Sequence, residues 1–169
     1  MVNGKKMDKK KRLLYIRIIA IIAILVSGYL VYEHYRTTPS EFCVIGEGFN
    51  CDIVNKSPYA EIGGIFYFLN FDLGLNVPLP NLPLPISGVS ILIFLSFVLM
   101  TYTIQKKQKF FNINPKNQIK LLKWLIVLSI VFALYLVYIE AFVLLNWCIY
   151  CLTLDVLILA EAILIKDLN

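Results

Sequence analysis

The stretch LLNWCIYCLTLDVLILAEAILI, residues 144–165, joins two thiols to an apolar segment long enough to approach the thickness of a membrane. Cys148 and Cys151 form a C-x-x-C pair at its start, and Asp155 and Glu161 are the only acids that interrupt it. A helix rises about 1.5 Å per residue, and the hydrocarbon core is about 30 Å thick. The stretch therefore predicts a membrane helix that begins with a dithiol.

The composition extends this interpretation to the whole chain. Of its 169 residues, 59% are hydrophobic and 16% are charged, whereas about a quarter are charged in soluble domains. Three further apolar stretches are long enough to span, and we predict an all-α integral membrane protein, a four-transmembrane-helix bundle that forms one domain, residues 1–169. The predicted spans are 13–35, 86–104, 121–145 and 148–166, with an external loop at 36–85. The apolar run of the first span exceeds that of a signal peptide, so we expect a retained helix.

Charge predicts the orientation of the helices. The chain up to residue 17 holds seven basic residues, and residues 105–123 hold six and no acid, whereas residues 36–85 hold two basic and five acidic residues. Basic residues remain on the cytoplasmic side. We therefore expect both termini in the cytoplasm, and the 36–85 loop and the turn between the third and fourth spans outside. The net charge of +5 is explained by contact with anionic membrane lipid, and no nucleic acid partner is expected.

This orientation places all four cysteines on the external side, where disulfides form and persist. Cys148 and Cys151 open a helix, where the helix dipole and unsatisfied N–H groups stabilise negative charge. A C-x-x-C cysteine at such a position has a lowered pKa, and the thiolate is the form that attacks a disulfide. The pattern predicts a redox-active dithiol, although two small apolar fillers of a helix would look the same.

The second pair, Cys43 and Cys51, has the spacing C-x7-C. Gly46 and Gly48 make the intervening loop pliable, so the two thiols can bond or separate. This pair alone is also compatible with a structural staple in an exported loop. No metal site is predicted, because zinc sites usually combine C-x2–4-C knuckles and C-x7-C fits them poorly. Two dithiols on one side of the membrane together favour exchange between them.

These motifs resemble those of the vitamin K epoxide reductase family and its microbial members. The likeness rests on the C-x7-C pair, on CDIVNKS with Ser57 six residues past Cys51, and on the C-x-x-C that opens the last span. It implies a four-helix bundle that holds a quinone, such as menaquinone or ubiquinone, near its outer end. It further implies that Cys151 reacts with the quinone and that Cys148 is its resolving partner. Cys51 would exchange with Cys148, and Cys43 would meet an external protein.

The resemblance therefore predicts a membrane thiol–quinone oxidoreductase that supports disulfide bond formation. The partner would be a separate thioredoxin-like (DsbA-like) protein, because the chain ends at Asn169 without a fused thioredoxin domain. Two alternatives stay open. One is a vitamin K epoxide or quinone reductase that uses the same thiol chemistry. The other is a non-enzymatic membrane scaffold whose disulfides staple its loops.

Further candidate site residues lie between the first two spans. Residues 58–70 are apolar and aromatic but too short to span, so we predict a short helix at the outer interface, followed by a proline-rich cap up to residue 85. In the family such a segment covers the quinone pocket. This makes Ser57, Tyr59 and Phe66 candidate quinone-binding residues, with Ser57 also expected to order the loop. A plain interfacial anchor is the alternative.

Acids inside membrane helices are candidate functional residues. Asp155 follows Cys151 by four residues and Cys148 by seven, so all three share one helical face. We expect Asp155 to relay a proton, to modulate the Cys151 thiolate, or to make a structural hydrogen bond inside the bundle. Glu140, near the outer end of the third span, is interpreted as a polar packing contact or an interfacial group.

Overall fold

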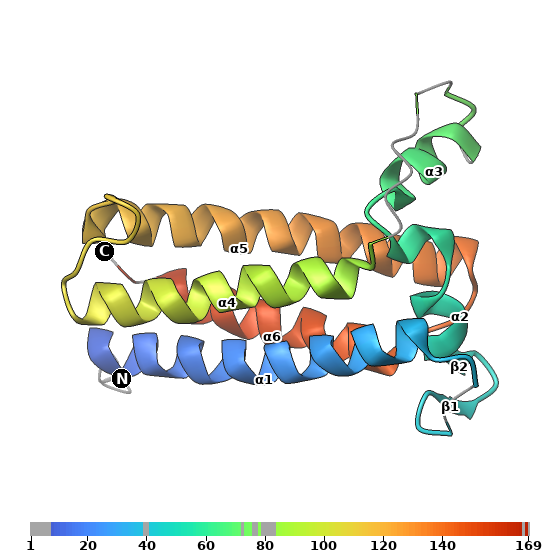
Figure 1. Cartoon of the computed structure of the whole chain (residues 1–169), viewed down its shortest axis with the longest axis horizontal. Helices are drawn as coiled ribbons and strands as arrows, with labels where there is room; N and C mark the ends of the chain where they lie inside the picture. The colour runs from blue at the N-terminus through green and yellow to red at the C-terminus, as the bar shows by residue number, and fades with distance from the viewer. Residues whose placement is uncertain are drawn as a thin grey trace, which may run out of the picture.

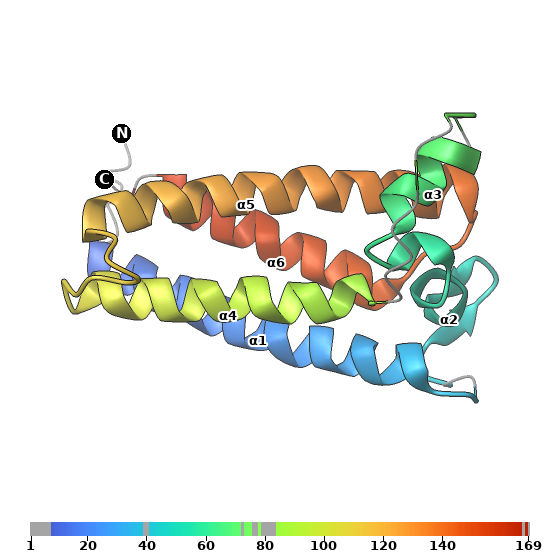
Figure 2. The same ribbon diagram turned by 45° about the horizontal axis from the view of Figure 1, so that its top comes forward.

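Four long helices run side by side along the molecule and form its body (Figure 1). The computed structural model describes residues 8–38, 41–71, 73–75, 78, 84–166 and 168. The helices are α1 (Lys9–Tyr35), α4 (Ile86–Gln105), α5 (Pro115–Tyr138) and α6 (Ile149–Lys166). Helix α1 contacts α4 and α6, and α5 contacts the same two helices, so the four close into a bundle (Figure 2).

Three of these helices are long and apolar enough to cross a membrane, which is compatible with the predicted all-α membrane protein. They are α1, α4, and α5 together with the π-helical turn Ile139–Val143 that continues it. Helix α5 begins at Pro115, earlier than the predicted residue 121, because proline fits the first helical turn and basic residues extend the helix beyond the apolar span. Helix α6 has 18 residues but includes Asp155, Glu161 and Lys166. That α6 crosses the membrane stays a prediction.

Small residues lie on the buried face of α1. Ala20, Ala23 and Ser27 of α1 are fully buried, and α4 presents Phe97 and Met100 as fully or almost fully buried side chains. Small side chains let helices approach closely where no water drives their association. Large apolar side chains on the outward faces of the bundle are exposed, including Leu25, Leu92, Trp124, Leu128, Val131, Leu134, Val156 and Ile163. Such outward faces suit a lipid environment.

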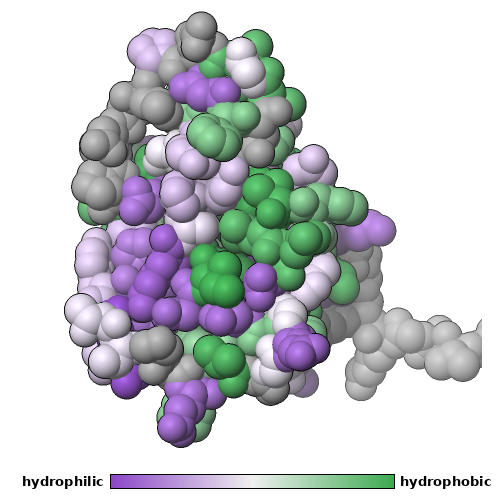
Figure 3. Space-filling view, turned by 90° about the vertical axis from the view of Figure 1, so that its right-hand side faces the viewer, coloured by the Kyte–Doolittle hydropathy of each residue, from purple (hydrophilic) through white to green (hydrophobic). Residues whose placement is uncertain are grey.

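The connection between α1 and α4 lies at the end of the bundle opposite the start of α1 (Figure 1). It contains strands β1 (Val44–Gly46) and β2 (Phe49–Asn50), helix α2 (Cys51–Asn55) and a 3-10 turn, Pro58–Ala60. The sequence predicted a pliable loop here, and the antiparallel β1–β2 hairpin was not foreseen. Gly46 and Gly48 have φ of 152° and 81°, values that allow the tight turn between the strands. Seen end-on, hydrophilic residues cover much of this end, beside a hydrophobic patch (Figure 3).

Helix α3 (Gly64–Phe71) extends away from the axis of the bundle (Figure 1). The predicted short helix over 58–70 is thus divided into the 3-10 turn and α3. Gly64 is required at the junction, because a Cβ there would lie 2.7 Å from the backbone carbonyl carbon of Tyr59. The ring of Phe68 packs edge-on against Tyr135 and Tyr138 of α5. The predicted proline-rich cap lies largely outside the described residues.

Candidate redox site

Backbone pairing joins the two cysteine-bearing segments. Strand β2 lies parallel to the residue before Cys148: the Asn50 N–H donates to the Trp147 carbonyl at 3.1 Å, and the Trp147 N–H donates to the Gly48 carbonyl at 2.9 Å. Cys51 directly follows Asn50, and Cys148 directly follows Trp147. In this parallel bridge Phe49 lies opposite Trp147, so Asn50 lies opposite Cys148 and Cys51 comes one residue beyond the position opposite Cys148.

The outer pair consists of two buried free thiols. Cys43 and Cys51 are each 1% exposed, and the Cys51 N–H donates to the Cys43 carbonyl at 2.9 Å. Burial, together with the neighbouring Cys51, raises the pKa of the Cys43 thiol from 9.0 to about 12. The Asn50 side chain caps α2 by accepting the N–H groups of Asp52 and Ile53, which fixes the start of the helix at Cys51. Cys43 is thus held as a neutral thiol in this state.

The inner pair, Cys148 and Cys151, forms a disulfide. Cys148 is fully buried and immediately precedes α6, and its sulfur accepts the Cys151 N–H at 3.2 Å. Tyr150, inside the C-x-x-C, places its ring 4.8 Å from that of Tyr29, whose hydroxyl lies 4.0 Å from the Cys43 sulfur. Helix α1 therefore contacts both cysteine pairs.

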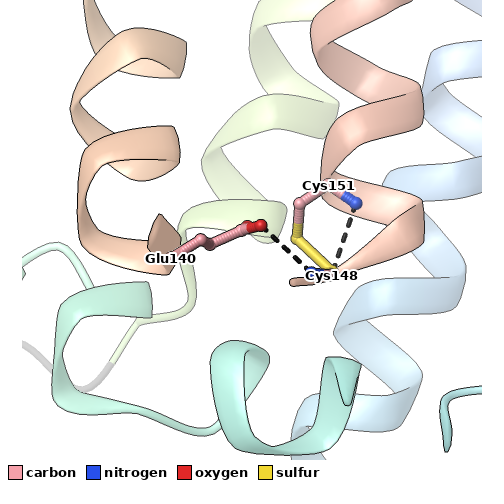
Figure 4. A group of neighbouring side chains, drawn as sticks. All are labelled: Glu140, Cys148 and Cys151. Atoms are coloured by element: carbon pink, nitrogen blue, oxygen red, sulfur yellow. Dashed lines mark hydrogen bonds between the residues drawn. A yellow bond between two sulfur atoms is a disulfide. The ribbon is translucent and has the colours of Figure 1, made fainter. Parts of the chain in front are cut away.

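Glu140 points from the π-helical turn toward the inner disulfide (Figure 4). Its Oε2 accepts the Cys148 N–H at 3.0 Å, and the side chain is 2% exposed. One carboxylate oxygen and the two sulfurs all lie within 4.8 Å of one another. The Glu140 side chain makes a polar packing contact, one of its two predicted roles, and is buried beside the cysteines. Its level relative to the membrane interface stays a prediction.

A cavity of about 390 Å³ lies within the bundle beside the disulfide. Cys151 and Asp155 of α6 reach its wall together with Glu140, Asn55 of α2 and Ser87 of α4. The rest of the lining is almost entirely apolar and includes Leu30, Ile62, Ile93, Phe94, Leu125, Phe132, Leu136, Leu154 and Ile158. An apolar cavity of this size with a few polar groups is typical of small-molecule sites.

Ser87 supplies an observation that favours a polar ligand in this cavity. Its hydroxyl is buried and has no hydrogen-bond partner among the described residues. A buried hydroxyl without a partner is costly, and a ligand carbonyl at the cavity wall would satisfy it. The apolar lining and this free donor together suit the ring and carbonyls of a quinone.

Of the predicted quinone-site residues, one lies at the cavity and three lie outside its described lining. Asp155 lines the cavity on the same helix as Cys151. Ser57 is buried and donates to the Val54 carbonyl at 2.7 Å, which orders the end of α2. Tyr59 is buried edge-on against Tyr67, and Phe66 is half-buried on α3. The described lining of the cavity includes neither Ser57, Tyr59 nor Phe66, so their contact with quinone stays a prediction.

Sequence reasoning missed Ser87 and Asn55 and gave Glu140 no active role. The available signal for Glu140 was an acid in an apolar span eight residues before Cys148. Its hydrogen bond to the Cys148 N–H is made from a π-helical turn, and no local sequence pattern predicted that turn. Glu140, Cys148 and Cys151 lie close together, but the two sulfurs are bonded to each other, so this cluster is not a metal site in the structure.

A family model described as the vitamin K epoxide reductase family matches residues 14–165. The chain belongs to this family. The match extends from α1 to α6 and includes both cysteine pairs. Members of the vitamin K epoxide reductase family are oxidoreductases of membranes, and a membrane redox function follows for this chain. A search of curated proteins finds no match.

Proposed function

We propose that this protein is a membrane thiol–quinone oxidoreductase that oxidises a separate thioredoxin-like protein. One observation carries the proposal: strand β2 is hydrogen-bonded to the residue before Cys148, so that the two cysteine pairs adjoin. Cys151 also lines the cavity inside the bundle. The arrangement supports a path from an outer dithiol to an inner disulfide and onward to an acceptor in the membrane.

In the structure the outer pair is reduced and the inner pair forms a disulfide. In the proposed cycle, this is the state before electrons move inward. The Cys51 thiolate attacks the Cys148 sulfur, the Cys148–Cys151 bond breaks, and Cys151 leaves as a thiolate. The Cys43 thiolate then attacks Cys51, and Cys148 leaves. The outer pair ends as a disulfide and the inner pair as a dithiol, and two electrons and two protons have moved inward.

Cavity residues would hold the quinone beside Cys151. Ser87 offers a hydroxyl that has no partner among the described residues, Asp155 offers a carboxyl group, and the apolar lining excludes water. A quinone bound there would supply the two-electron acceptor that restores the inner disulfide. Tyr59 and Phe66 would contact it only if the segment that carries them closes over the cavity.

The surface around the outer pair suits a protein donor. Four apolar side chains of this segment are exposed: Phe42, Val44, Phe49 and Ile53. Clustered exposed apolar residues are characteristic of interaction sites, and aromatic residues often contribute most of the binding energy. A thioredoxin-like partner would dock here and reduce the Cys43–Cys51 disulfide formed in each cycle.

The proposed membrane arrangement is one domain with α6 as the fourth span. Its 18 residues give about 27 Å at 1.5 Å per residue, close to the hydrocarbon thickness. The start of α1 and the end of α6 lie at one end of the bundle, and the β1–β2 hairpin lies at the other (Figure 1). The basic segments favour the cytoplasm for the first end, so the cysteines would be external.

Quinone reduction by purified protein in detergent, with a reduced thioredoxin-like donor, tests the function. We expect Cys148→Ala and Cys151→Ala to abolish turnover with any donor. Cys43→Ala and Cys51→Ala should abolish turnover with the protein donor but leave some with dithiothreitol, which can reduce the inner disulfide directly. A folded wild-type protein that reduces no quinone, with fixed disulfide pairing, would instead support a stapled scaffold.

A further inference from the structure

Glu140 is a buried carboxylate that the electron path above does not use. Its side chain is 2% exposed, lines the cavity, and lies within 4.8 Å of both inner sulfurs. It is held there by the Cys148 N–H at 3.0 Å and by a π-helical turn, an irregularity often found at functional sites. A carboxylate removed from water at this position calls for a role beyond packing.

We propose that Glu140 accepts a proton from the inner dithiol when the disulfide re-forms; this inference rests on the proposed function. The Cys148 thiol gives its proton to the Glu140 carboxylate, and the resulting thiolate forms the S–S bond with Cys151. The electron pair leaves to the quinone acceptor. Because Glu140 also lines the cavity, the proton taken from Cys148 can pass to the reduced acceptor. The Cys151 thiol, which lines the same cavity, would supply the second of the two protons as its S–H bond breaks. The carboxylate is then ready for the next cycle.

The other groups around the cavity leave Glu140 best placed for this step. Helix α6 contributes Asp155, which lines the same cavity but is not part of the close cluster with the two sulfurs. Helices α2 and α4 contribute Asn55 and Ser87, which carry no charge, and α1 contributes Leu30. The charged or titratable side chains in the described lining are therefore Glu140, Cys151 and Asp155.

Glu140→Gln separates proton transfer from structure. Glutamine keeps an oxygen that accepts the Cys148 N–H but lacks the negative charge. In quinone-free, reduced protein, the inner thiols should react faster with iodoacetamide near neutral pH, since a nearby negative charge no longer opposes thiolate formation. The kcat for quinone reduction should nevertheless fall by about 100-fold or more, as expected for the loss of an acid–base group. The two readouts thus move in opposite directions.

Two matched variants serve as controls. Glu161→Gln removes another fully buried carboxylate of the bundle, one that is outside the described cavity lining, and should change neither readout. Asp155→Asn removes the second cavity carboxylate and should lower kcat less than Glu140→Gln does. Wild-type kcat in Glu140→Gln, or a parallel fall of both readouts, would overturn the inference. Failure of the wild type to reduce quinone would instead refute the proposed function. Even then, an alkylation rate of the inner thiols that is the same in Glu140→Gln and in the wild type would count against the role of Glu140.

A separate observation concerns the opposite end of the bundle. A cavity of about 780 Å³, here called the lysine groove, opens between α1, α5 and the connection from α4 to α5. Six lysines line it: Lys9, Lys10, Lys107, Lys116, Lys120 and Lys123. Asp8 is the one acid among the described lining residues. Six lysines against one acid give the described lining a positive charge, which attracts anions.

The floor of the lysine groove is apolar. Leu13, Ile104, Ile119 and Leu168 line it and are between 1% and 7% exposed. The groove lies where α1, α4 and α5, the three span candidates, end or begin, which is the level of lipid headgroups. Its lining therefore combines cationic side chains with an apolar surface.

We infer that the lysine groove binds an anionic phospholipid. The lysines would contact the phosphate, and the apolar floor would contact the upper acyl chains. Basic pockets between membrane helices bind such headgroups. A free phosphate ion would gain nothing from the apolar floor, so the combined lining favours the amphiphile.

Lipid binding to the detergent-purified protein can be measured by native mass spectrometry with phosphatidylglycerol and phosphatidylcholine. We expect the triple variant Lys116→Gln, Lys120→Gln, Lys123→Gln to weaken phosphatidylglycerol binding about tenfold, since each basic contact contributes about 1 kcal/mol at most once screened. The matched variant Lys11→Gln, Lys106→Gln, Lys109→Gln loses equal charge near the same end, at lysines outside the described lining, and should lose less than about twofold. Equal losses, or displacement of the lipid by millimolar inorganic phosphate, would overturn the inference.

Discussion

Cys43 shows how burial controls one thiol of the site. Its pKa is raised to about 12, first by burial and then by the neighbouring Cys51, so the group is almost entirely protonated at neutral pH. The thiolate fraction therefore increases about tenfold per pH unit until the pH approaches the raised pKa. A partner protein that opens the hairpin would remove part of this burial and make Cys43 more reactive.

We expect alkylation of Cys43 to keep accelerating with pH. In protein with an intact inner disulfide, the rate constant for iodoacetamide, followed by mass mapping, should rise about tenfold per unit from pH 7 to 10. The urea-denatured protein is the control, and its Cys43 should level off near pH 9, the ordinary range of a thiol. A plateau below pH 9 in the folded protein would contradict burial as the dominant cause.

Ser87 tests the ligand assigned to the cavity. Ser87→Ala should raise the KM for quinone about three- to tenfold, equivalent to one neutral hydrogen bond of about 1 kcal/mol, with little change in stability. Ser90→Ala is the matched control on the same helix, because the Ser90 hydroxyl already donates to the Ile86 carbonyl at 3.0 Å. Steady-state kinetics at several quinone concentrations measure the effect. Equal KM values in both variants would show that Ser87 does not contact the quinone.

At the scale of elements, the pairing of β2 with the start of α6 determines whether the two dithiols communicate. Gly48 adopts φ of 81° and its carbonyl accepts the Trp147 N–H. Gly48→Val should strain this turn by about 1–3 kcal/mol and loosen the pairing. Electron transfer from the outer to the inner pair, measured by rapid quench and thiol trapping, should slow at least tenfold.

Gly74→Val provides the comparison, because Gly74 also has positive φ, 66°, and has open space where a side chain would lie. It should leave the exchange rate unchanged. Quinone reduction driven by dithiothreitol should survive in both variants, since the inner pair and the cavity are intact. Unchanged exchange in Gly48→Val would argue against the β2–Trp147 pairing as the route.

The exposed apolar surface around the outer pair is the second element-level feature with a testable role. Phe42 is 74% exposed next to Cys43. Phe42→Ser should raise the KM for a thioredoxin-like donor about fivefold or more, the loss of roughly 1 kcal/mol of aromatic contact, while the rate with dithiothreitol stays constant. Phe71→Ser on α3, where the side chain is 77% exposed, is the matched control. A similar rise in KM in both variants would show that the hairpin is not the docking surface.

At the scale of the whole molecule, the two ends of the bundle differ in charge and chemistry. Single cysteines placed in a cysteine-free background can report the side of each end. Leu145 and Phe111 are 72% and 85% exposed in opposite turns, and both have positive φ. In sealed, right-side-out vesicles, a membrane-impermeant maleimide should label Leu145→Cys at once, and Phe111→Cys only after permeabilisation.

Lys166→Cys, at the end of α6, extends this test to the proposed fourth span. It should behave as Phe111→Cys does, because a spanning α6 returns the chain to the basic side. Labelling of Lys166→Cys from outside would show that α6 does not cross. Labelling of Phe111→Cys from outside in intact vesicles would reverse the proposed orientation.

Local sequence determined the parts of this protein that depend on composition and spacing. Long apolar runs specified the helices α1, α4 and α5, because a membrane requires every backbone group to bond within its own segment. The spacing of Cys148 and Cys151 at a helix start, with Cys43 and Cys51 earlier, indicated the family, which the match over residues 14–165 established.

Tertiary structure alone decided what surrounds these residues. The β2–Trp147 pairing joins segments almost a hundred residues apart, and no local pattern specifies which backbone groups meet. Glu140 in the π-helical turn meets the Cys148 N–H across the turn into α6, and Ser87 lies at a cavity that exists only once α4, α5 and α6 pack together. Sequence fixes which groups are available, whereas long-range packing fixes which of them face one another, and the chemistry of the site depends on that second choice.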